Sequence, residues 1–390
     1  MQIRDDINFF DNRFLMFVLD QMANDLDDMS RPEDKVIRMT LGKSELPLHQ
    51  DIIDEMEEAL NDYAKYSLVF PAGLPSLKDR LSRYYSEHFH AEIDQKNFII
   101  SLGTSSIFRN LFELLVQTND EVLLPIPYYS LYKFSALLVG ADIRYYKINH
   151  KNNRLDIESF KRNFTDKTKI VVINTPGNPL GNVLSEDELY EIDRFVNGRA
   201  VIVNDEIYSN VYFDEPNRSV INLENTKSTF VTTNAFSKAY RMYSRRVGYC
   251  IVPDELIEPL TVIQHHTLLT VDPVVQFGAI KALEYQSEVK DLVRNYKERR
   301  NYTMKKMSSL SSVIPIYSQG GFYITLDCEN HMRNHHISDS LTLAQDILNK
   351  VKVATVPGSD FGLPCTLRLS FSSSRYVEGI DRLTQYFGGA

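Results

Sequence analysis

The sequence predicts an α/β protein with a three-layer, mostly parallel sheet and a second, smaller α+β domain. Three observations favour this fold class: a length of 390 residues, 43% hydrophobic residues, and apolar runs that alternate with helix-period segments. Short β-branched runs between amphipathic helices are typical of strands covered on both faces. We therefore expect a large domain over residues 46–290 and a small domain made of residues 1–45 and 291–390.

The large domain is expected to begin with helices and to continue with alternating strands and helices. Apolar residues recur at helical spacing in three segments, 51–60, 77–85 and 107–115. Ser185 and Glu188 form a capping box that opens a further helix. The expected strands are 98–101, 122–124, 170–173, 200–203, 229–232 and 247–252. Such sheets bind ligands beyond the carboxyl ends of their strands.

The pattern changes after about residue 290, where a charged amphipathic helix over 286–310 leads into shorter elements. The strands expected there are 313–317, 322–326, 351–356 and 366–371, with one more helix over 341–350. These elements predict the small α+β domain, which the first forty residues are expected to join.

Composition and charge exclude several classes of protein. The formal net charge is −9, and no basic stripe is present, so we expect no nucleic-acid partner. The three cysteines, Cys250, Cys328 and Cys365, are far apart and form no CxxC pair, so neither a disulfide framework nor a metal site is expected. No signal-peptide pattern or membrane-spanning run is visible, which predicts a soluble cytoplasmic protein.

The most informative segment is 237–249, Ser-Lys-Ala-Tyr-Arg-Met-Tyr-Ser-Arg-Arg-Val-Gly-Tyr, between two predicted strands. Lys238 follows Ser237, and Arg246 comes eight residues later. A lysine with a lowered pKa forms an imine with the aldehyde of pyridoxal 5′-phosphate (PLP), and an arginine fork binds its phosphate. The alternative is a basic surface loop, but the full spacing favours a PLP site.

A carboxylate follows the strand at 200–203, in the segment Asn-Asp-Glu-Ile-Tyr. Asp205 at this strand end can pair with a protonated pyridine nitrogen and keep the ring an electron sink. Tyr208 can hydrogen-bond the phenolic oxygen of the ring. The alternative is an aspartate that caps the next helix, which would be the better interpretation of this segment alone.

Three further segments also follow predicted strands. Asn178 lies in a rigid turn, Asn-Thr-Pro-Gly-Asn-Pro-Leu-Gly, that can place its amide against the phenolic oxygen. Gly103, Thr104 and Ser105 open a helix whose free amides can bind phosphate. Tyr129 can stack on the pyridine ring. A plain turn, an ordinary helix cap and a core tyrosine are the respective alternatives, but all five segments lie on the same side of one sheet.

In these motifs the chain resembles the class I/II aminotransferases, the fold-type I PLP enzymes related to aspartate aminotransferase. The resemblance runs from Leu41-Gly42 to Arg368-Leu369-Ser370-Phe371. It implies that Lys238 holds PLP as a Schiff base and moves a proton between the substrate Cα and the cofactor. It also implies that Asp205 pairs with the pyridine nitrogen.

The same resemblance assigns the remaining site residues. Arg246, Ser237 and the segment 103–105 bind the phosphate. Asn178 and Tyr208 hold the phenolic oxygen, and Tyr129 stacks on the ring. Arg368 grips the substrate α-carboxylate in a bidentate pair, and the backbone of Gly42 lies beside that carboxylate.

The family works as homodimers with active sites at the subunit interface, so a homodimer is expected here. Tyr66 is matched to the tyrosine that reaches the partner's phosphate, although it lies seven residues before Gly73 rather than about five. Five positions depart from the family pattern. Ala235 replaces a hydroxyl residue, Leu180 a threonine, Arg245 an apolar residue and Ser244 a glycine, and Arg241 is likewise unusual.

The predicted function is a PLP-dependent aminotransferase that moves an amino group between an amino acid and a 2-oxo acid. The alternative is another PLP reaction on the same scaffold, such as that of a β/γ-lyase, cyclase, decarboxylase or oxidase acting on an amino acid. A PLP-fold regulator would need an additional N-terminal DNA-binding domain. A Rossmann oxidoreductase is disfavoured because no GxGxxG opens a βαβ unit.

Overall fold

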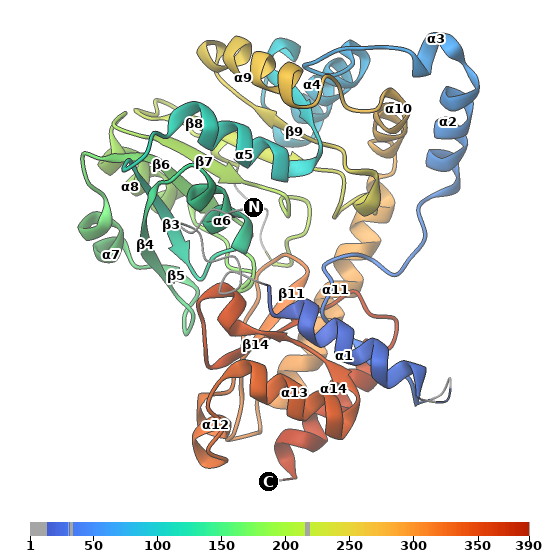
Figure 1. The fold of residues 1–390 in the computed structure, drawn as a ribbon, viewed down its shortest axis with the longest axis vertical. Helices are drawn as coiled ribbons and strands as arrows, with labels where there is room; N and C mark the ends of the chain where they lie inside the picture. Colours follow the sequence, from blue (N-terminus) through green and yellow to red (C-terminus); the bar gives the residue numbers. More distant parts are fainter. Residues whose placement is uncertain (1–13, 30, 32–33, 215–218, 390) are drawn as a thin grey trace, which may run out of the picture.

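A computed structural model describes residues 14–29, 31, 34–214 and 219–389 of the chain. These residues form three sheets of eight, four and two strands. The eight-stranded sheet occupies one part of the molecule, and the two smaller sheets lie with the C-terminal helices in the other part (Figure 1). None of the helices in these ranges is long and apolar enough to cross a membrane.

The eight-stranded sheet is mostly parallel. Its order is β2 (Phe98–Ser101), β9 (Gly248–Ile251), β8 (Thr229–Ala235), β7 (Val201–Asp205), β6 (Thr168–Asn174), β3 (Glu121–Ile126), β4 (Asp142–Asn149) and β5 (Arg154–Leu155). Only β9 and the short edge strand β5 run antiparallel to their neighbours. The predicted fold class is therefore confirmed.

Helices cover both faces of this sheet and extend beyond it. They are α2 (Gln50–Asn61), α3 (Tyr63–Tyr66), α4 (Pro75–Phe89), α5 (Gly103–Leu115), α6 (Ser130–Leu138), α7 (Ile157–Asn163), α8 (Glu186–Val196), α9 (Asp254–Thr267) and α10 (Pro273–Ala282). The expected capping box begins α8, where the Ser185 amide donates to Glu188 at 2.8 Å and the Glu188 amide donates to the Ser185 hydroxyl at 3.3 Å.

Successive side chains of the buried strands alternate between the two faces of the sheet, which explains why helices cover both faces in a three-layer arrangement. In β6, Ile170 and Val172 belong to one hydrophobic cluster, which contains the apolar residues of α5. Val171 and Ile173 belong to another, which contains those of α8. Because successive side chains of a strand point to opposite faces, a continuous apolar run requires a cover on each side.

Strand β4 was not expected from the sequence. It is less buried than β3, and charged side chains interrupt its apolar residues. Its neighbour β5 is only two residues long, so β4 lies near the edge of the sheet, where a strand can be more polar.

The smaller sheets lie beside helices from both ends of the chain. The four-stranded sheet has the order β10 (Ile314–Ile316), β11 (Tyr323–Asp327), β14 (Thr366–Ser370) and β13 (Val356–Pro357). The two-stranded sheet pairs β1 (Ile37–Arg38) with β12 (Val353–Ala354) in parallel. The helices are α1 (Met16–Asp28), α11 (Gln286–Met307), α12 (Glu329–Asn334), α13 (Ser340–Val351) and α14 (Tyr376–Gly388).

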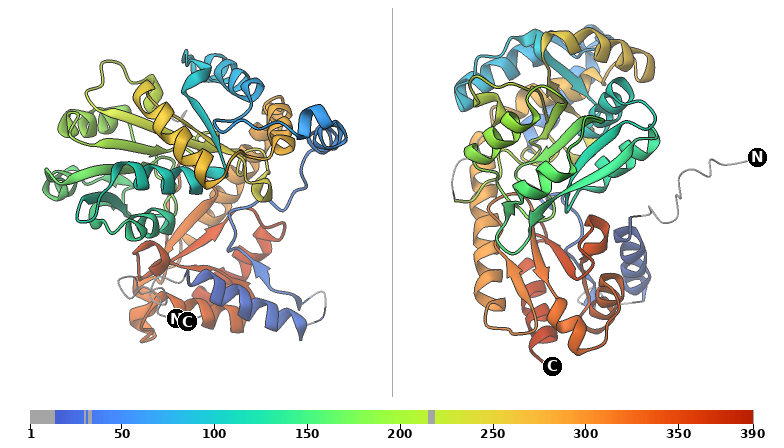
Figure 2. Two further views of the ribbon diagram at one scale, coloured as in Figure 1. Left: turned by 45° about the horizontal axis from the view of Figure 1, so that its top comes forward. Right: turned by 90° about the vertical axis from the view of Figure 1, so that its left-hand side faces the viewer.

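The expected single strand over 351–356 is wrong in one respect. The segment forms two short strands in different sheets, β12 beside β1 and β13 beside β14, with Thr355 between them. The N-terminal helix α1 packs near α13, and Figure 2 shows it beside the C-terminal elements in both views. The division into domains at residues 45/46 and 290/291 stays a prediction.

Candidate active site

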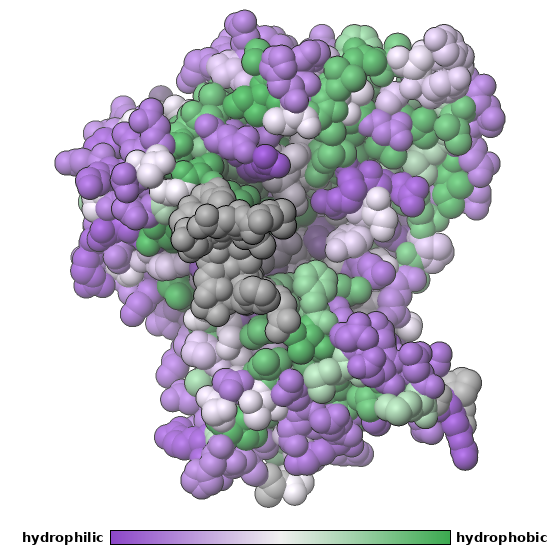
Figure 3. Space-filling view, viewed as in Figure 1, coloured by the Kyte–Doolittle hydropathy of each residue, from purple (hydrophilic) through white to green (hydrophobic). Residues whose placement is uncertain are grey.

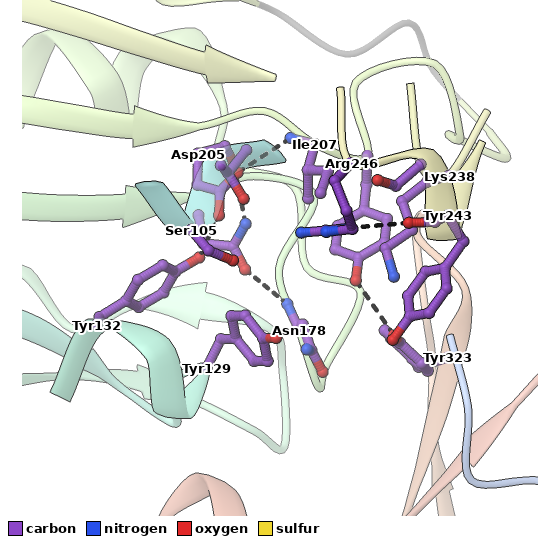
Figure 4. Close-up of a pocket in the computed structure, with 14 residues that line it drawn as sticks. Ser105, Tyr129, Tyr132, Asn178, Asp205, Ile207, Lys238, Tyr243, Arg246 and Tyr323 are labelled. Carbon is purple, nitrogen blue, oxygen red and sulfur yellow. Dashed lines mark hydrogen bonds between the residues drawn. The ribbon is translucent and has the colours of Figure 1, made fainter. Parts of the chain in front are cut away.

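A cavity of about 360 Å³ lies at the carboxyl ends of the parallel strands. Figure 4 shows its lining side chains pointing toward one another from the sheet, from the helices that follow it and from β11. The sequence-predicted residues among them are Thr104, Ser105, Tyr129, Asn178, Asp205, Tyr208, Ser237, Lys238 and Arg246. The fold thus brings together residues from all five predicted segments.

Lys238 lies in the loop between β8 and β9, and only 9% of the residue is exposed. Its Nζ donates a hydrogen bond to the carbonyl oxygen of Gly42 at 2.6 Å. Burial is the largest cause that lowers the pKa of this amine below its usual value, with further lowering by the Arg368 and Arg246 charges. An amine with a lowered pKa is more readily available in its neutral, nucleophilic form.

Position 42 has no room for a side chain. A Cβ there would lie 1.7 Å from the Tyr323 Oη and 3.1 Å from the Lys238 Nζ. Contacts under 3.0 Å are essentially never made by a real Cβ, so glycine allows the backbone to approach the lysine this closely.

Asp205 ends β7 at the base of the cavity. Its Oδ2 accepts from the Tyr132 hydroxyl at 2.7 Å, and its Oδ1 accepts from the Thr233 hydroxyl at 3.3 Å and from the Ile207 amide at 3.2 Å. Burial raises the pKa of this carboxyl to about 6, and the hydrogen bonds oppose the shift. A cationic group bound against Asp205 would favour the ionised form.

An anion-binding cradle lies at the N-terminus of α5. Gly103 has φ +69°, and a Cβ at this position would lie 2.6 Å from an Arg246 guanidinium nitrogen. The guanidinium also donates to the Tyr243 carbonyl at 2.9 Å, while Thr104, Ser105 and Ser237 line the same cavity. A helix N-terminus with hydroxyls and a guanidinium beside it suits a phosphate group.

Arg368, on β14, is 3% exposed and does not itself line the cavity, but it contacts Asn178 and Tyr323, which do. One terminal nitrogen donates to the Asn178 Oδ1 at 2.9 Å, and the other donates to the Thr40 carbonyl at 2.7 Å. Its Nε is buried and has no hydrogen-bond partner within the described ranges. The guanidinium carbon lies 3.9 Å from the centre of the Tyr323 ring, which holds it in place. A buried guanidinium with an unused donor can bind a carboxylate.

Two predicted tyrosines line the cavity, and a third does not. Tyr129 precedes α6, and burial raises its pKa to about 12. The Tyr208 hydroxyl donates to the Tyr323 hydroxyl at 3.2 Å. Tyr66, in contrast, is 44% exposed and is absent from the lining of this cavity. A role for Tyr66 in a partner's site stays a prediction.

Sequence reasoning did not assign roles to four polar lining residues: Tyr132, Asn174, Tyr243 and Tyr323. Asn174 and Tyr243 lie inside the predicted motifs of Asn178 and Lys238, and Tyr132 lies three residues after Tyr129, so this spacing could have identified them. Tyr323 lies in an ordinary predicted strand of the C-terminal part, and no local signal marks it.

Asn174 connects two of the predicted residues. Its Nδ2 donates to the Asp205 carbonyl at 3.0 Å, and its Oδ1 accepts from the Asn178 amide at 2.8 Å. It therefore fixes the turn that carries Asn178 against the end of β7. Across the part of the chain with described coordinates, no cluster of His, Cys, Asp and Glu could hold a metal ion.

The sequence matches the family model "Aminotransferase class I and II" over residues 35–386. It is 32% identical to a probable aspartate/prephenate aminotransferase from Aquifex aeolicus over 80% of this chain and 81% of that protein. It is 28% identical to an aspartate aminotransferase from Bacillus sp. (strain YM-2), covering 90% of this chain and 91% of the relative.

A similar solved structure is the aspartate aminotransferase from Thermotoga maritima, with a TM-score of 0.88 and 26% identity over 99% of this chain and 100% of that one. The fold class, the family and the transferase activity expected from the sequence are confirmed. Since the family model covers most of the chain, this protein belongs to the class I and II aminotransferases.

Proposed function

We propose that this aminotransferase uses PLP bound at Lys238 to move an amino group between an amino acid and a 2-oxo acid. The observation that carries the proposal is one cavity that combines a buried amine, a buried carboxylate and an anion cradle. The amine is that of Lys238, the carboxylate that of Asp205, and the cradle consists of Arg246 and the start of α5.

The residues fit the cofactor group by group. Arg246, Ser237 and the hydroxyls of Thr104 and Ser105 would hold the phosphate. Asp205 would face the ring nitrogen, because its pKa, raised by burial, calls for a cationic partner. When bound, PLP supplies an aldehyde for the amine and a ring that draws electrons from the substrate Cα.

Other lining residues would orient the ring. Tyr129 would lie against its face. Asn178 and Tyr208 would hold its phenolic oxygen, and both already contact neighbours that restrict their rotation, Arg368 and Tyr323.

Arg368 would bind the substrate α-carboxylate, using the Nε donor that has no partner among the described atoms. Its position beside Asn178 brings that carboxylate close to the Lys238 amine across the cavity. Lys238 Nζ would then take the proton from the substrate Cα and later return it. Only 9% of Lys238 is exposed, which limits the access of water to this transfer.

We also propose a homodimer in the cytoplasm. Large apolar side chains are exposed around α2 and α3, including Leu60 at 62%, Tyr63 at 73% and Val69 at 52%. On the face drawn in Figure 3, hydrophobic side chains gather over the upper part of the molecule, where these helices lie. Exposed apolar surface of this kind favours association, which supports the dimer. The three free cysteines suit a reducing compartment, which supports the cytoplasm. Light scattering on the purified chain tests the dimer.

The proposed function is tested with Lys238→Ala. The wild-type protein is expected to bind PLP with a visible absorbance band and to yield a modified Lys238 peptide after borohydride reduction. The variant is expected to lose the band, the modified peptide and turnover. Lys96→Ala is a matched control, since this lysine is 53% exposed and pairs with Asp254 at the surface. Full activity in Lys238→Ala would refute the proposal.

A further inference from the structure

Tyr323 shares the space beside Gly42 with the Lys238 amine. The residue lies on β11, far along the chain, and is 3% exposed. A Cβ on Gly42 would lie 1.7 Å from the Tyr323 Oη and 3.1 Å from the Lys238 Nζ. The phenolic oxygen and the amine nitrogen therefore lie beside the same point of the backbone. Figure 4 shows both side chains at the same end of the cavity.

The Tyr323 oxygen is placed as a hydrogen-bond acceptor. The Tyr208 hydroxyl donates to the Tyr323 oxygen at 3.2 Å, and the guanidinium carbon of Arg368 lies 3.9 Å from the centre of the Tyr323 ring. The other titratable groups that face it are Lys238, Tyr129 and the Tyr296 phenol. Two of the groups around this oxygen, Lys238 and Arg368, are cations.

These cations distinguish Tyr323 from the other cavity tyrosines. Burial would raise its pKa, but Lys238 and Arg368, together with the hydrogen bond from Tyr208, outweigh burial, and the pKa of Tyr323 is lowered. Burial instead raises the pKa of Tyr129, Tyr132 and Tyr208. Tyr323 is therefore the phenol best suited to stabilise a nearby positive charge.

Lys238 needs such a partner. Burial, Arg368 and Arg246 all make its ammonium form less favourable, whereas Tyr323 and Asp205 favour that form, Tyr323 more strongly. In the proposed reaction, Lys238 must accept a proton from the substrate, and a lysine with a strongly lowered pKa would be a weak base.

We propose that Tyr323 is a further catalytic residue, whose phenolic oxygen accepts a hydrogen bond from the Lys238 ammonium and so keeps this lysine basic. The inference rests on the proposed role of Lys238. In the step concerned, the substrate Cα–H bond breaks, its electron pair stays with the substrate, and an N–H bond forms on Lys238. The new positive charge on the Nζ is stabilised by the Tyr323 oxygen, which itself gains and loses no proton.

The test is Tyr323→Phe, which removes the oxygen and keeps the ring against Arg368. In the cofactor-free full-length chain, Lys238 is labelled with an amine-selective acylating reagent over a range of pH, and the labelled peptide is quantified by mass spectrometry. The midpoint for labelling is expected to fall by about one pH unit, because the ammonium loses its partner. Tyr302→Phe is the control, since its hydroxyl bonds Asp381 outside the cavity, and its midpoint should not move.

A second measurement uses the holoenzyme. Tyr323→Phe is expected to lower kcat about tenfold and to leave KM within about twofold, because the lost contact forms only when Lys238 becomes charged. An unshifted labelling midpoint in a folded Tyr323→Phe protein would overturn the inference alone, as would an unchanged kcat. Retained activity in Lys238→Ala would instead refute the proposed function and this inference with it.

Discussion

Replacing Gly42 with alanine is the sharpest perturbation of the cavity. The new Cβ would lie 1.7 Å from the Tyr323 Oη, and contacts below 3.0 Å are essentially never made, so this oxygen must move by at least about 1.3 Å. That movement would separate the hydroxyls of Tyr323 and Tyr208, now 3.2 Å apart, and tilt the ring that holds Arg368.

A misplacement of about 1 Å in a catalytic site can cost about 100-fold in rate. We therefore expect Gly42→Ala to lower kcat/KM about 100-fold, which corresponds to about 2.7 kcal/mol of transition-state stabilisation. The measurement is steady-state kinetics with one amino acid and one 2-oxo acid, together with a thermal unfolding curve that shows whether the variant is folded.

Two comparisons make this result interpretable. Gly388→Ala is the matched control, because its Cβ would meet only Leu310, at 3.4 Å, and it should keep wild-type kinetics. The double variant Gly42→Ala/Tyr323→Phe lacks the closest atom, but the ring carbon Cζ would remain 2.7 Å away, so only partial steric relief is expected. A folded Gly42→Ala protein with more than half the wild-type kcat/KM would refute the reasoning.

The other predictions concern binding and stability. Arg368→Lys keeps the charge and loses the planar fork, so kcat/KM should fall about 100-fold; an unchanged value would argue against carboxylate binding there. Asp214→Asn should lower the free energy of unfolding in urea at pH 7 by about 2 kcal/mol, because buried Arg300 loses its charged partner. The loss is moderate because the Asp214 side chain is 34% exposed, so solvent screens the pair. The Arg300 hydrogen bonds lower the pKa of Asp214 to about 2, so this stabilisation should be present above its usual pKa of 3.8, decline as pH falls toward 2, and be missing from the variant at every pH. Ser185→Ala removes the capping box and should cost about 1 kcal/mol in the same assay, with no effect on kcat.

Much of the fold followed from local patterns. The buried strands β2, β6 and β7 appeared as short apolar runs, because a strand covered on both faces has no polar side, and β8 appeared as a β-branched run. Strand β4, next to the edge strand β5, and the split between β12 and β13 did not follow, since they depend on which neighbour a segment pairs with. Pairing is decided by tertiary contacts rather than by the residues of the segment itself.

The sequence by itself identified most of the polar residues that line the cavity. The spacing from Lys238 to Arg246 and the strand-end positions of Asp205 and Asn178 are properties of continuous segments, and a parallel sheet gathers such segments at one edge.

Only the tertiary structure decided what surrounds the reactive amine. Tyr132 reaches Asp205 from 73 positions away, Gly42 meets Lys238 from 196 positions away, and Tyr323 arrives from a different sheet. A tyrosine on a helix or strand has the same local pattern whether it packs in a core or faces a cavity. The difference arises from charges placed beside it by distant parts of the chain, and at Tyr323 those charges oppose the effect of burial and lower its pKa.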